Sequence, residues 1–457
     1  MNTLIVLATT AVILLFLTVF NLKKWILPVA ITGLILALGL NMDEWGAPRT
    51  WYNMIIIDNF SVSFGSLIML STLFVFFLSY LYYKNQNKAP EGVYSIIIFS
   101  VIGALVMISS INLVNFFIGL EIMSISLYLL AGSEKKSIAS NEAAMKYFLL
   151  GSFASAFLLF GIALLFGATG SLYFKDIALY STSHFGTSPL MFKAGILLVA
   201  LGISFKVGAV PFHFWVPDVY QGSPTIITAF MITAIKVAGF AAFLRLTLSC
   251  FPGDNAIWTG SIAIIAAASI IIGNLAALGQ SSVKRMLAYS SIAHTGYLLI
   301  AIVCLQLSSS QVILYYSYAY VFANLAAFAV LIVLREISGN SSIETFNGLG
   351  KLNKLSAITF TLAMLSLTGI PPLAGFMGKY NVFALAIQNG YLWLVIIAIL
   401  GSVISIFYYF WPIISIYMKP SELKEFSLTG IGTLTIVVIT LISLIIGFVP
   451  GWIMGWI

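Results

Sequence analysis

The chain contains about fourteen apolar runs of roughly 20 residues each, which is the length that a helix needs to cross the hydrocarbon of a bilayer. In lipid every backbone N–H and C=O group must be hydrogen-bonded within the protein, so runs of this kind form helices. The sequence therefore predicts an all-α polytopic membrane protein. The predicted spans are residues 3–20, 25–40, 60–83, 93–111, 113–132, 143–167, 191–209, 226–249, 257–279, 287–307, 311–334, 356–388, 391–417 and 428–449.

The charged residues are few and unevenly placed. They make up 8% of the 457 residues, whereas soluble domains carry about 25%. Thirteen basic residues lie in the odd-numbered loops between spans, and four lie in the even-numbered loops or at their edges. Because basic loops stay in the cytoplasm, this bias predicts a multi-pass protein with both termini outside, in the periplasm. It also accounts for the net charge of +7 without a nucleic-acid partner.

Motifs for bound cofactors are missing from the sequence. It has no glycine-rich dinucleotide loop after a strand, no Walker loop, no HExxH and no Ser or Cys nucleophile arrangement. Cys250 and Cys304 are its two cysteines, and their spacing suits neither a metal site nor an Fe–S cluster. We therefore expect no cofactor or metal in this chain, and we expect any redox chemistry to take place in another subunit.

Four lysines and one glutamate lie within the predicted spans and away from the loop edges: Glu121, Lys146, Lys206, Lys236 and Lys379. A charge at the centre of a membrane helix costs roughly 2.5–3.5 kcal/mol on insertion scales, so such residues mark functional sites. Lys146 is one turn inside its span, where a long side chain can also reach the surface. Glu121 serves either in proton transfer or as the structural partner of a buried lysine. The other three lysines have apolar turns on both sides, and they predict an ion or proton path.

Two spans are interrupted by proline and glycine next to these lysines. Residues 201–240 carry Lys206 and Lys236 on either side of a Pro- and Gly-containing turn, and residues 362–387 carry PPLAG just before Lys379. Interrupted spans in corresponding positions of two halves are typical of inverted-repeat transporters. The interrupted helices are the seventh and twelfth, which predicts two inverted five-helix repeats, helices 4–8 and 9–13. The predicted divisions are 1–92 (helices 1–3), 93–256 (repeat 1), 257–417 (repeat 2) and 418–457 (helix 14).

The spacing of the ionisable residues suggests how the repeats align. Lys206 and Lys379 are 173 residues apart, and so are Glu121 and His294. Aligning the two YLL tripeptides gives an offset of 169 instead. The two offsets differ by about one helical turn and keep the same helix face.

Two histidines belong to the same polar regions. His213 follows the first interruption, and we expect it to bridge Lys206 and Lys236, because histidine titrates near neutral pH. His294 lies mid-helix among small polar residues, in KRMLAYSSIAHTGYLL, as either a relay or a hydrogen-bonded packing residue. Both are candidate proton relays.

Six stretches resemble one known family. They are FFIGLEIMSISLYLL, EAAMKYFLLGSFASAFLLFGIALLFGATG, FKVGAVPFHFWVPDVYQGSPT, SSVKRMLAYSSIAHTGYLL, FNGLGKLNK and LTGIPPLAGFMGKY. These stretches are similar to the antiporter-like subunits of respiratory complex I, the proton-translocating NADH:quinone oxidoreductase. VPDVYQGSPT and the lysine at 379 resemble the N type, the smallest of the three bacterial kinds. The resemblance covers nearly the whole chain from about residue 90 onward.

The resemblance implies a proton channel along a central hydrophilic axis. It implies a Glu–Lys pair on helices 5 and 7, here Glu121 and Lys206, with Lys236 as the central relay and Lys379 on the outlet side. The two histidines match relay positions less specifically. The resemblance also implies a place in the bacterial inner membrane beside other complex I membrane subunits, including further antiporter-like ones. NAD, FMN, Fe–S clusters and quinone are expected in the partner subunits.

Two other functions share these features. A subunit of a multi-component Na⁺/H⁺ antiporter has the same repeat and the same lysines but needs no redox partner. A scaffold subunit would use its charges only to hold neighbouring subunits together. Without the resemblance, periodicity and spacing predict only a membrane transporter with an internal polar axis.

Overall fold

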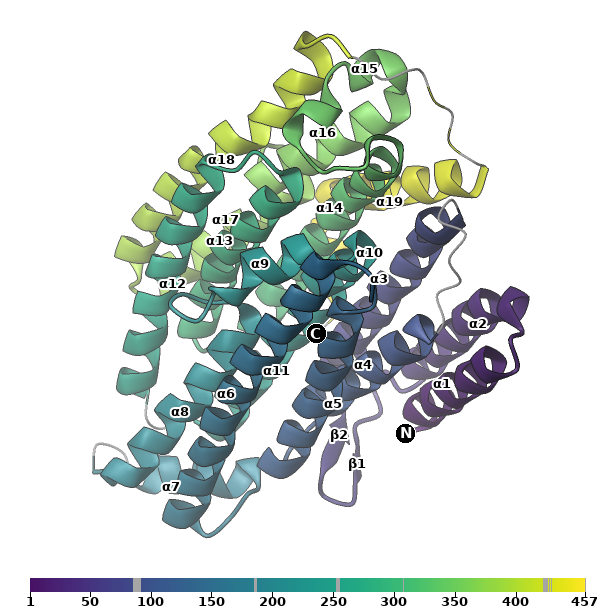
Figure 1. Cartoon of the computed structure of the whole chain (residues 1–457). Coiled ribbons are helices and arrows are strands. Elements are labelled where there is room, and N and C mark those ends of the chain that lie inside the picture. Colours follow the sequence, from purple (N-terminus) through teal and green to yellow (C-terminus); the bar gives the residue numbers. More distant parts are fainter. Residues whose placement is uncertain are drawn as a thin grey trace.

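The structure is a computed structural model that describes residues 1–84, 92–184, 187–251, 255–306, 308–421, 426, 428 and 430–456. It is a bundle of long helices that run roughly side by side (Figure 1). Within the described residues, 12 helices are long and apolar enough to cross a membrane, and Val93–Ile108 and Lys354–Thr368 are shorter apolar helices. The predicted α-helical polytopic membrane fold is confirmed, whereas the number of fourteen spans stays a prediction.

Helices occupy most of the described chain, and every predicted apolar run overlaps at least one of them. They are α1 (Asn2–Val19), α2 (Lys23–Met42), α3 (Asn59–Lys84), α4 (Val93–Ile108), α5 (Leu113–Ala131), α6 (Ile138–Thr169), α7 (Phe174–Ser183), α8 (Leu190–Val207), α9 (Trp215–Gly222), α10 (Thr225–Phe230), the π-helix η1 (Met231–Ile235), α11 (Lys236–Cys250), α12 (Asn255–Leu278), α13 (Val283–Val303), α14 (Ser308–Ser338), the 3₁₀-helix η2 (Ile343–Phe346), α15 (Leu349–Leu352), α16 (Lys354–Thr368), α17 (Ala374–Gln388), α18 (Leu392–Met418), α19 (Gly430–Phe448) and α20 (Pro450–Met454).

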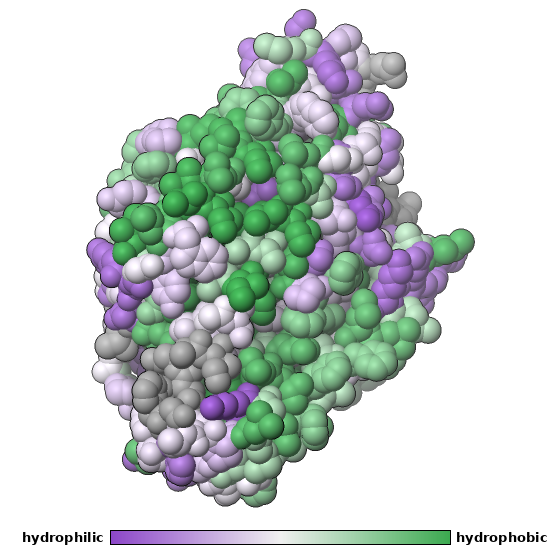
Figure 2. Space-filling model, turned by 90° about the vertical axis from the view of Figure 1, so that its left-hand side faces the viewer, coloured by the Kyte–Doolittle hydropathy of each residue, from purple (hydrophilic) through white to green (hydrophobic). Residues whose placement is uncertain are grey.

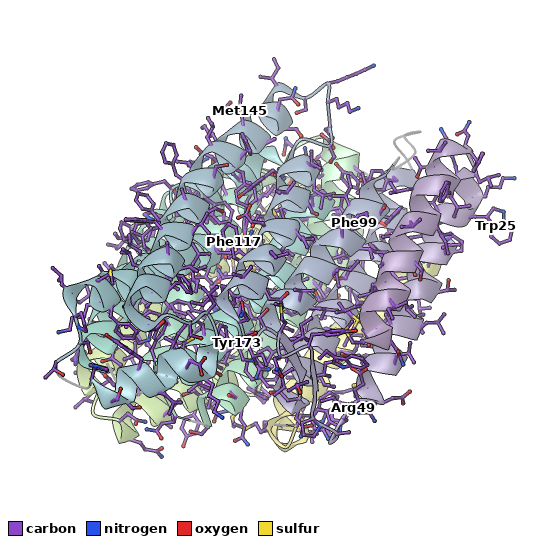
Figure 3. All side chains as sticks on the ribbon, turned by 90° about the horizontal axis from the view of Figure 1, so that it is seen from below. Trp25, Arg49, Phe99, Phe117, Met145 and Tyr173 are labelled. Carbon is purple, nitrogen blue, oxygen red and sulfur yellow. The ribbon has the colours of Figure 1, made fainter. Side chains whose placement is uncertain are left out.

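Several short elements lie outside the predicted spans, among them a hairpin and a short helix. Strands β1 (Arg49–Trp51) and β2 (Ile55–Ile57) form an antiparallel hairpin between α2 and α3, and the short helix α7 follows α6. Both lie at the lower end of the bundle in Figure 1. Their labelled residues Arg49 and Tyr173 mark this end in Figure 3, which views the molecule from below. They cover the turns between spans and leave the membrane helices as predicted.

The helices differ strongly in how deeply they are buried. For each helix we compare the share of residues that are buried in an apolar window of 18 residues. This share is 100% for residues 225–250 and 94% for α13 and α14, but 28% for α1. Outer helices instead present a broad apolar surface (Figure 2), where lipid is the natural neighbour. Trp25 and Met145 point away from the bundle in Figure 3. The predicted site residues of the central helices are therefore shielded from lipid.

The two chain ends meet at one end of the bundle. The Met1 amino group donates to the Glu44 carboxylate at 3.1 Å. The neighbouring Trp45 packs edge-on against Trp456, with 5.9 Å between the ring centroids. An even number of membrane crossings is required for both ends to lie on the same side.

The two interruptions lie where the sequence predicted them, and they end their helices in the same way. Gly208 (φ +72°) follows α8 and Gly369 (φ +90°) follows α16. At each break the N–H groups of the glycine and of the next residue donate to carbonyls of the last turn, which is a Schellman motif. Lys206 precedes its break and Lys379 follows the other, so the two lysines do not occupy equivalent positions.

Two isolated β-bridges also recur in the two halves. Asn112, just before α5, pairs with Tyr173 after α6, and Ser282, just before α13, pairs with Ser342 after α14. Ser282 lies 170 residues after Asn112, and Ser342 lies 169 residues after Tyr173. This agrees with the offset from the YLL tripeptides and supports the proposed internal repeat.

The offset of 170 changes which residues correspond. It pairs Glu121 of α5 with Ser291 of α13, and Ser124 of α5 with His294 of α13. The offset of 173, which paired Glu121 with His294, stays a prediction.

Candidate functional site

Lys236 lies at the centre of the bundle, directly after the π-helix η1. Single π-helical turns inside α-helices occur frequently at functional sites. The Lys236 side chain is buried, and its ammonium donates to both the backbone carbonyl and the hydroxyl of Ser291 on α13. The Tyr320 ring on α14 lies 5.6 Å from the ammonium nitrogen. The packing thus joins Lys236 to two other central helices through neutral groups.

Lys206 lies in the last turn of α8, just before the first break. Its ammonium donates to the Ser124 hydroxyl on α5 at 2.8 Å and to the Tyr147 hydroxyl on α6 at 3.4 Å. The side chain is 9% exposed. The break allows the lysine to reach into the space between α5 and α6.

Glu121 is close to Lys206 without touching it. The Glu121 carboxylate accepts a hydrogen bond from Ser155 on α6. Glu121 lies one turn before Ser124, which holds the Lys206 ammonium, so the lysine experiences the carboxylate's charge at longer range. The structure thus brings the two predicted partners to one place but shows no direct ion pair between these described side chains.

Lys379 lies in α17, in the second half of the other broken helix. Its ammonium donates to the carbonyl oxygen of Thr368, the last residue of α16, at 2.7 Å. The carbonyl end of a helix carries partial negative charge and favours a cation. The Tyr297 ring lies 5.0 Å from the ammonium nitrogen. Lys379 is thus held at the carbonyl end of a half-helix.

These three lysines share one property. In the described part of the chain, no carboxylate lies within 4.0 Å of Lys206, Lys236 or Lys379. A buried ion without an opposite charge costs several kcal/mol. Each lysine therefore differs from a structural ion pair, in which a carboxylate stands beside the cation.

His213 lies in the first break, between α8 and α9. Its ring is 7% exposed and packs on the Phe214 ring, with 4.6 Å between centroids. The hydrogen bonds of Lys206 and Lys236 go to serine and tyrosine instead. The predicted histidine bridge between those two lysines is therefore not present in this structure.

His294 lies on α13 inside a ring of tyrosines. Its Nδ1 atom is 2.7 Å from the Tyr316 hydroxyl on α14, and its Nε2 atom is 3.2 Å from the Tyr409 hydroxyl on α18. The rings of Tyr320 and Tyr297 lie 5.0 and 5.8 Å away, centroid to centroid. The side chain is buried. Since Tyr320 also covers Lys236 and Tyr297 also covers Lys379, His294 lies between the two lysines.

The tyrosines and serines of this axis were missed by the sequence analysis. The stretch YYSYAY in α14 contains two of the tyrosines, and SSIAH in α13 contains the serines and the histidine. Polar residues repeated along a deeply buried helix are a usable signal. It was overlooked because tyrosine is also common at membrane interfaces.

Lys146 belongs to a different environment. Its ammonium is 2.8 Å from Glu142, one turn earlier, and 2.8 Å from Asp218 on α9. Asp218 also accepts from Arg285 on α13 at 3.1 Å. The Lys146 side chain is 42% exposed. It therefore lies in a partly solvated cluster of ion pairs, as expected for a lysine that reaches the surface.

Arg245 on α11 shows how this fold stabilises a fixed buried charge. Its guanidinium makes two hydrogen bonds to Asp58, at 2.6 and 2.7 Å, and one to the Ile108 carbonyl at the end of α4. Asp58 also accepts from the Ser61 N–H in the first turn of α3. Burial alone would raise the pKa of the Asp58 carboxyl, but the bonds and charge of Arg245 outweigh burial and hold that pKa below its ordinary value.

Two of the basic residues assigned to loops are in fact buried. Lys284 is 1% exposed and donates to the carbonyls of Gln221 and Ser223 at the end of α9. Arg245, assigned to an even-numbered loop edge, is paired with Asp58. Without these two residues, the odd-numbered loops hold twelve basic residues and the even-numbered loops or their edges hold three. The excess of basic residues in the odd-numbered loops therefore remains.

The geometry supports proton transfer better than metal or cofactor binding. Within the described residues, no group of three or more His, Cys, Asp or Glu side chains could hold a metal ion. Lysine, histidine, serine and tyrosine side chains can each give and take a proton. The buried groups therefore form a candidate proton-transfer axis from Glu121 through Lys206, Lys236 and His294 to Lys379.

Known proteins resemble the chain along nearly its whole length. A family model described as NADH:quinone oxidoreductase/Mrp antiporter, TM, matches residues 110–405. NADH-quinone oxidoreductase subunit N from Cytophaga hutchinsonii is 41% identical over 447 residues, which cover 98% of this chain and 96% of that protein.

Solved structures resemble the fold as well. A chain of respiratory complex I from Thermus thermophilus superposes with a TM-score of 0.86 and 34% identity, covering 99% of this chain and 98% of that one. A chain of the Mrp complex from Dietzia sp. DQ12-45-1b gives a TM-score of 0.85 at 17% identity, covering 99% and 95%. The second likeness concerns the fold alone.

Proposed function

Since the chain belongs to the family of NADH-quinone oxidoreductase subunit N, we propose that it translocates protons across a bacterial inner membrane while redox chemistry proceeds in other subunits. The protons move along Glu121, Lys206, Lys236, His294 and Lys379. His213 and Lys146 are secondary candidates, because the first touches neither neighbouring lysine and the second is ion-paired at the surface.

The observation that carries this proposal is the contrast between the lysines and Arg245. The bundle holds one buried arginine with a carboxylate beside it, at 2.6 Å. The buried lysines Lys206, Lys236 and Lys379 have only neutral hydrogen-bond partners among the described residues, and so does the buried Lys284 at the end of α9. Arginine stays charged in proteins, whereas a buried lysine can lose and regain its proton. Lysines without counter-charges suit a path along which protons come and go.

We propose that the cofactors lie in partner subunits. NAD, FMN, Fe–S clusters and quinone are expected there, and the neighbours of this chain in the membrane are other complex I subunits, including further antiporter-like ones. In this arrangement the chain contributes to the oxidoreductase as its translocating part.

A subunit of a multi-component Na⁺/H⁺ antiporter is the alternative. The likeness to the Mrp complex supports it only at the level of the fold, because the identity is 17%. The relatives named subunit N are far more similar. Dependence of transport on NADH oxidation, rather than on an imposed Na⁺ gradient, would distinguish the two functions.

The repeats and the orientation are part of the proposal. The two repeats span residues 93–256 and 257–417, and both termini face the periplasm. Lys136, in a turn, and Lys175, on α7, are exposed in connections predicted on opposite sides, and Cys250 and Cys304 are buried. A Lys136→Cys variant should react with an impermeant thiol reagent only from the cytoplasm, and a Lys175→Cys variant only from outside. Reaction of both from one side would contradict the topology.

Glu121→Gln tests the function at the first group of the axis. Glutamine keeps the shape and can still accept from Ser155, but it removes the charge near Lys206. We expect NADH-driven proton translocation and NADH oxidation to fall together by about a hundredfold, the lower end of the range for loss of a general acid or base. The complex should still assemble.

The matched control is Glu142→Gln. Glu142 is 60% exposed and pairs with Lys146 at the surface, away from the three unpaired lysines. This variant should translocate protons almost normally. If an assembled Glu121→Gln complex did the same, Glu121 would be a structural residue.

A further inference from the structure

His294 is the one imidazole that the described structure bonds to tyrosine hydroxyls through both ring nitrogens. The two tyrosines come from different helices, Tyr316 from α14 and Tyr409 from α18. The Tyr409 hydroxyl is also hydrogen-bonded to the Ser290 hydroxyl on α13. Serine, tyrosine, imidazole and tyrosine thus form one unbroken, buried chain of hydrogen bonds.

The direction of this chain can reverse. A neutral imidazole has one donor nitrogen and one acceptor nitrogen, and each hydroxyl can donate or accept. One tyrosine must therefore donate to His294 while the other accepts from it. When the imidazole changes tautomer, donor and acceptor exchange roles in every hydrogen bond of the chain. A chain with this property can pass a proton from one end to the other.

The chain begins beside Lys236. The Lys236 ammonium donates to Ser291, and Ser290, at the start of the chain, is the adjacent residue on α13. Tyr320 contacts both regions, because its ring lies 5.6 Å from the Lys236 nitrogen and 5.0 Å from the His294 ring. The first end of the chain is therefore close to the central lysine.

The chain ends towards Lys379. Tyr316 and His294 line a cavity of about 10 Å³ together with Ser366, in the last turn of α16. This is close to the volume that one water molecule needs. The Lys379 ammonium is bonded to Thr368 in the same turn. The Tyr316 end of the hydrogen-bond chain thus lies towards the end of α16, which holds Lys379.

We propose that the hydroxyl groups of Tyr409 and Tyr316 carry protons, with His294 between them, from Lys236 to Lys379. This inference rests on the proposed function and deepens it. The Tyr409 oxygen takes up a proton and passes its own to Nε2 of His294. The imidazole releases the proton on Nδ1 to the Tyr316 oxygen, whose own proton leaves towards Lys379. Each group gives one proton for each that it receives, so none keeps a charge.

Phenylalanine at either tyrosine tests the inference, because it keeps the ring and removes only the hydroxyl. In the purified complex reconstituted into vesicles, Tyr316→Phe and Tyr409→Phe should each lower NADH-driven proton translocation at least tenfold. The controls are Tyr315→Phe, whose hydroxyl donates to the Ile446 carbonyl, and Tyr417→Phe, whose hydroxyl accepts from Thr361. Both controls should pump at nearly the rate of the parent complex.

A fluorinated tyrosine at position 316 or 409 gives a readout that a packing role would not change. It keeps ring and hydroxyl but makes the hydroxyl more acidic, so the pH profile of proton translocation should move to lower pH. This variant also decides the matter if the phenylalanine variants fail to assemble. An unchanged pH profile, or phenylalanine variants that pump like the controls, would overturn the relay.

Lys379→Met, measured in parallel, separates this inference from the proposed function. If Lys379→Met pumps poorly while the tyrosine variants pump normally, protons reach Lys379 by another route and only the tyrosine relay is wrong. If Lys379→Met also pumps normally, the proposed lysine path itself is wrong.

Discussion

Replacing Arg245 by methionine is expected to destabilise the folded membrane domain by about 3–5 kcal/mol, because it leaves a buried charge without its partner. The guanidinium joins α11 to Asp58 before α3 and to the Ile108 carbonyl at the end of α4. Its side chain is 10% exposed and that of Asp58 23%. Less assembled complex and a lower temperature of thermal inactivation should result.

The matched control is Arg49→Met. Arg49 is exposed on β1, so its loss should change the inactivation temperature little. The double variant Arg245→Met with Asp58→Asn removes both charges and should recover part of the loss, since asparagine can still cap α3. An Arg245→Met complex that assembles and inactivates like the parent would show that the pair contributes nothing.

The pH dependence of this pair follows from the lowered pKa of Asp58. A carboxyl group whose folded-state pKa is depressed contributes stability above its unfolded pKa, and this contribution is lost as the pH falls through the folded value. The Arg245–Asp58 pair should therefore stabilise the protein fully at neutral pH. The difference in inactivation temperature between the parent and Arg245→Met complexes should become smaller only at acidic pH.

Much of the fold could be predicted because lipid imposes strong rules. An apolar run of about 20 residues has few alternatives to a spanning helix. The breaks could be predicted as well, because Gly208 and Gly369 adopt a backbone conformation that other residues avoid. The lysines stood out since charge inside an apolar run is costly. These three signals are local in the sequence.

The contacts between helices could not be predicted in the same way. In a soluble protein a polar stripe marks the exposed face of a helix, but in a membrane the lipid side and the packed side are both apolar. Nothing local in YYSYAY shows that Tyr316 faces His294 while Tyr315 bonds the Ile446 carbonyl. The facing direction is decided by packing against α13, α18 and α19.

Pairings over long sequence distances were equally hidden. Arg245 and Asp58 are 187 residues apart, and Lys284 reaches 61 residues back to Ser223. By position alone both basic residues fit loops or helix edges, so they were counted as exposed charges. The offset between Lys206 and Lys379 depends on side-chain type rather than on backbone position. It compared charged side chains, whereas the backbone shows that the two lysines lie on opposite sides of their breaks.

Arginine at position 206 or 379 is expected to leave the complex assembled but to reduce proton translocation about as severely as methionine does. Lys206 is bonded to hydroxyl groups of neighbouring helices and Lys379 to a backbone carbonyl, all neutral oxygens to which an arginine could also donate. It would supply the fixed charge that a structural role requires. It cannot lose and regain a proton, because its guanidinium stays charged in proteins. A path that needs deprotonation therefore fails with arginine.

Assembly must be separated from transport in these variants. The planar guanidinium is larger than an ammonium, so the amount of assembled complex and its inactivation temperature are measured first. Variants that match the parent in both then enter the transport assay. A Lys136→Arg variant in an exposed turn provides the control for the same exchange outside the bundle.

The rate of NADH-driven proton translocation per assembled complex, measured in vesicles for Lys379→Arg, Lys379→Met and the parent complex, tests most directly whether the buried lysines exchange protons. The rate is divided by the amount of assembled complex, so that variants that assemble to different extents can be compared. The account predicts that arginine and methionine both lower this rate well below that of the parent. A rate that arginine restores and methionine does not would show that a fixed charge suffices, and the proton-exchange role of Lys379 would be wrong.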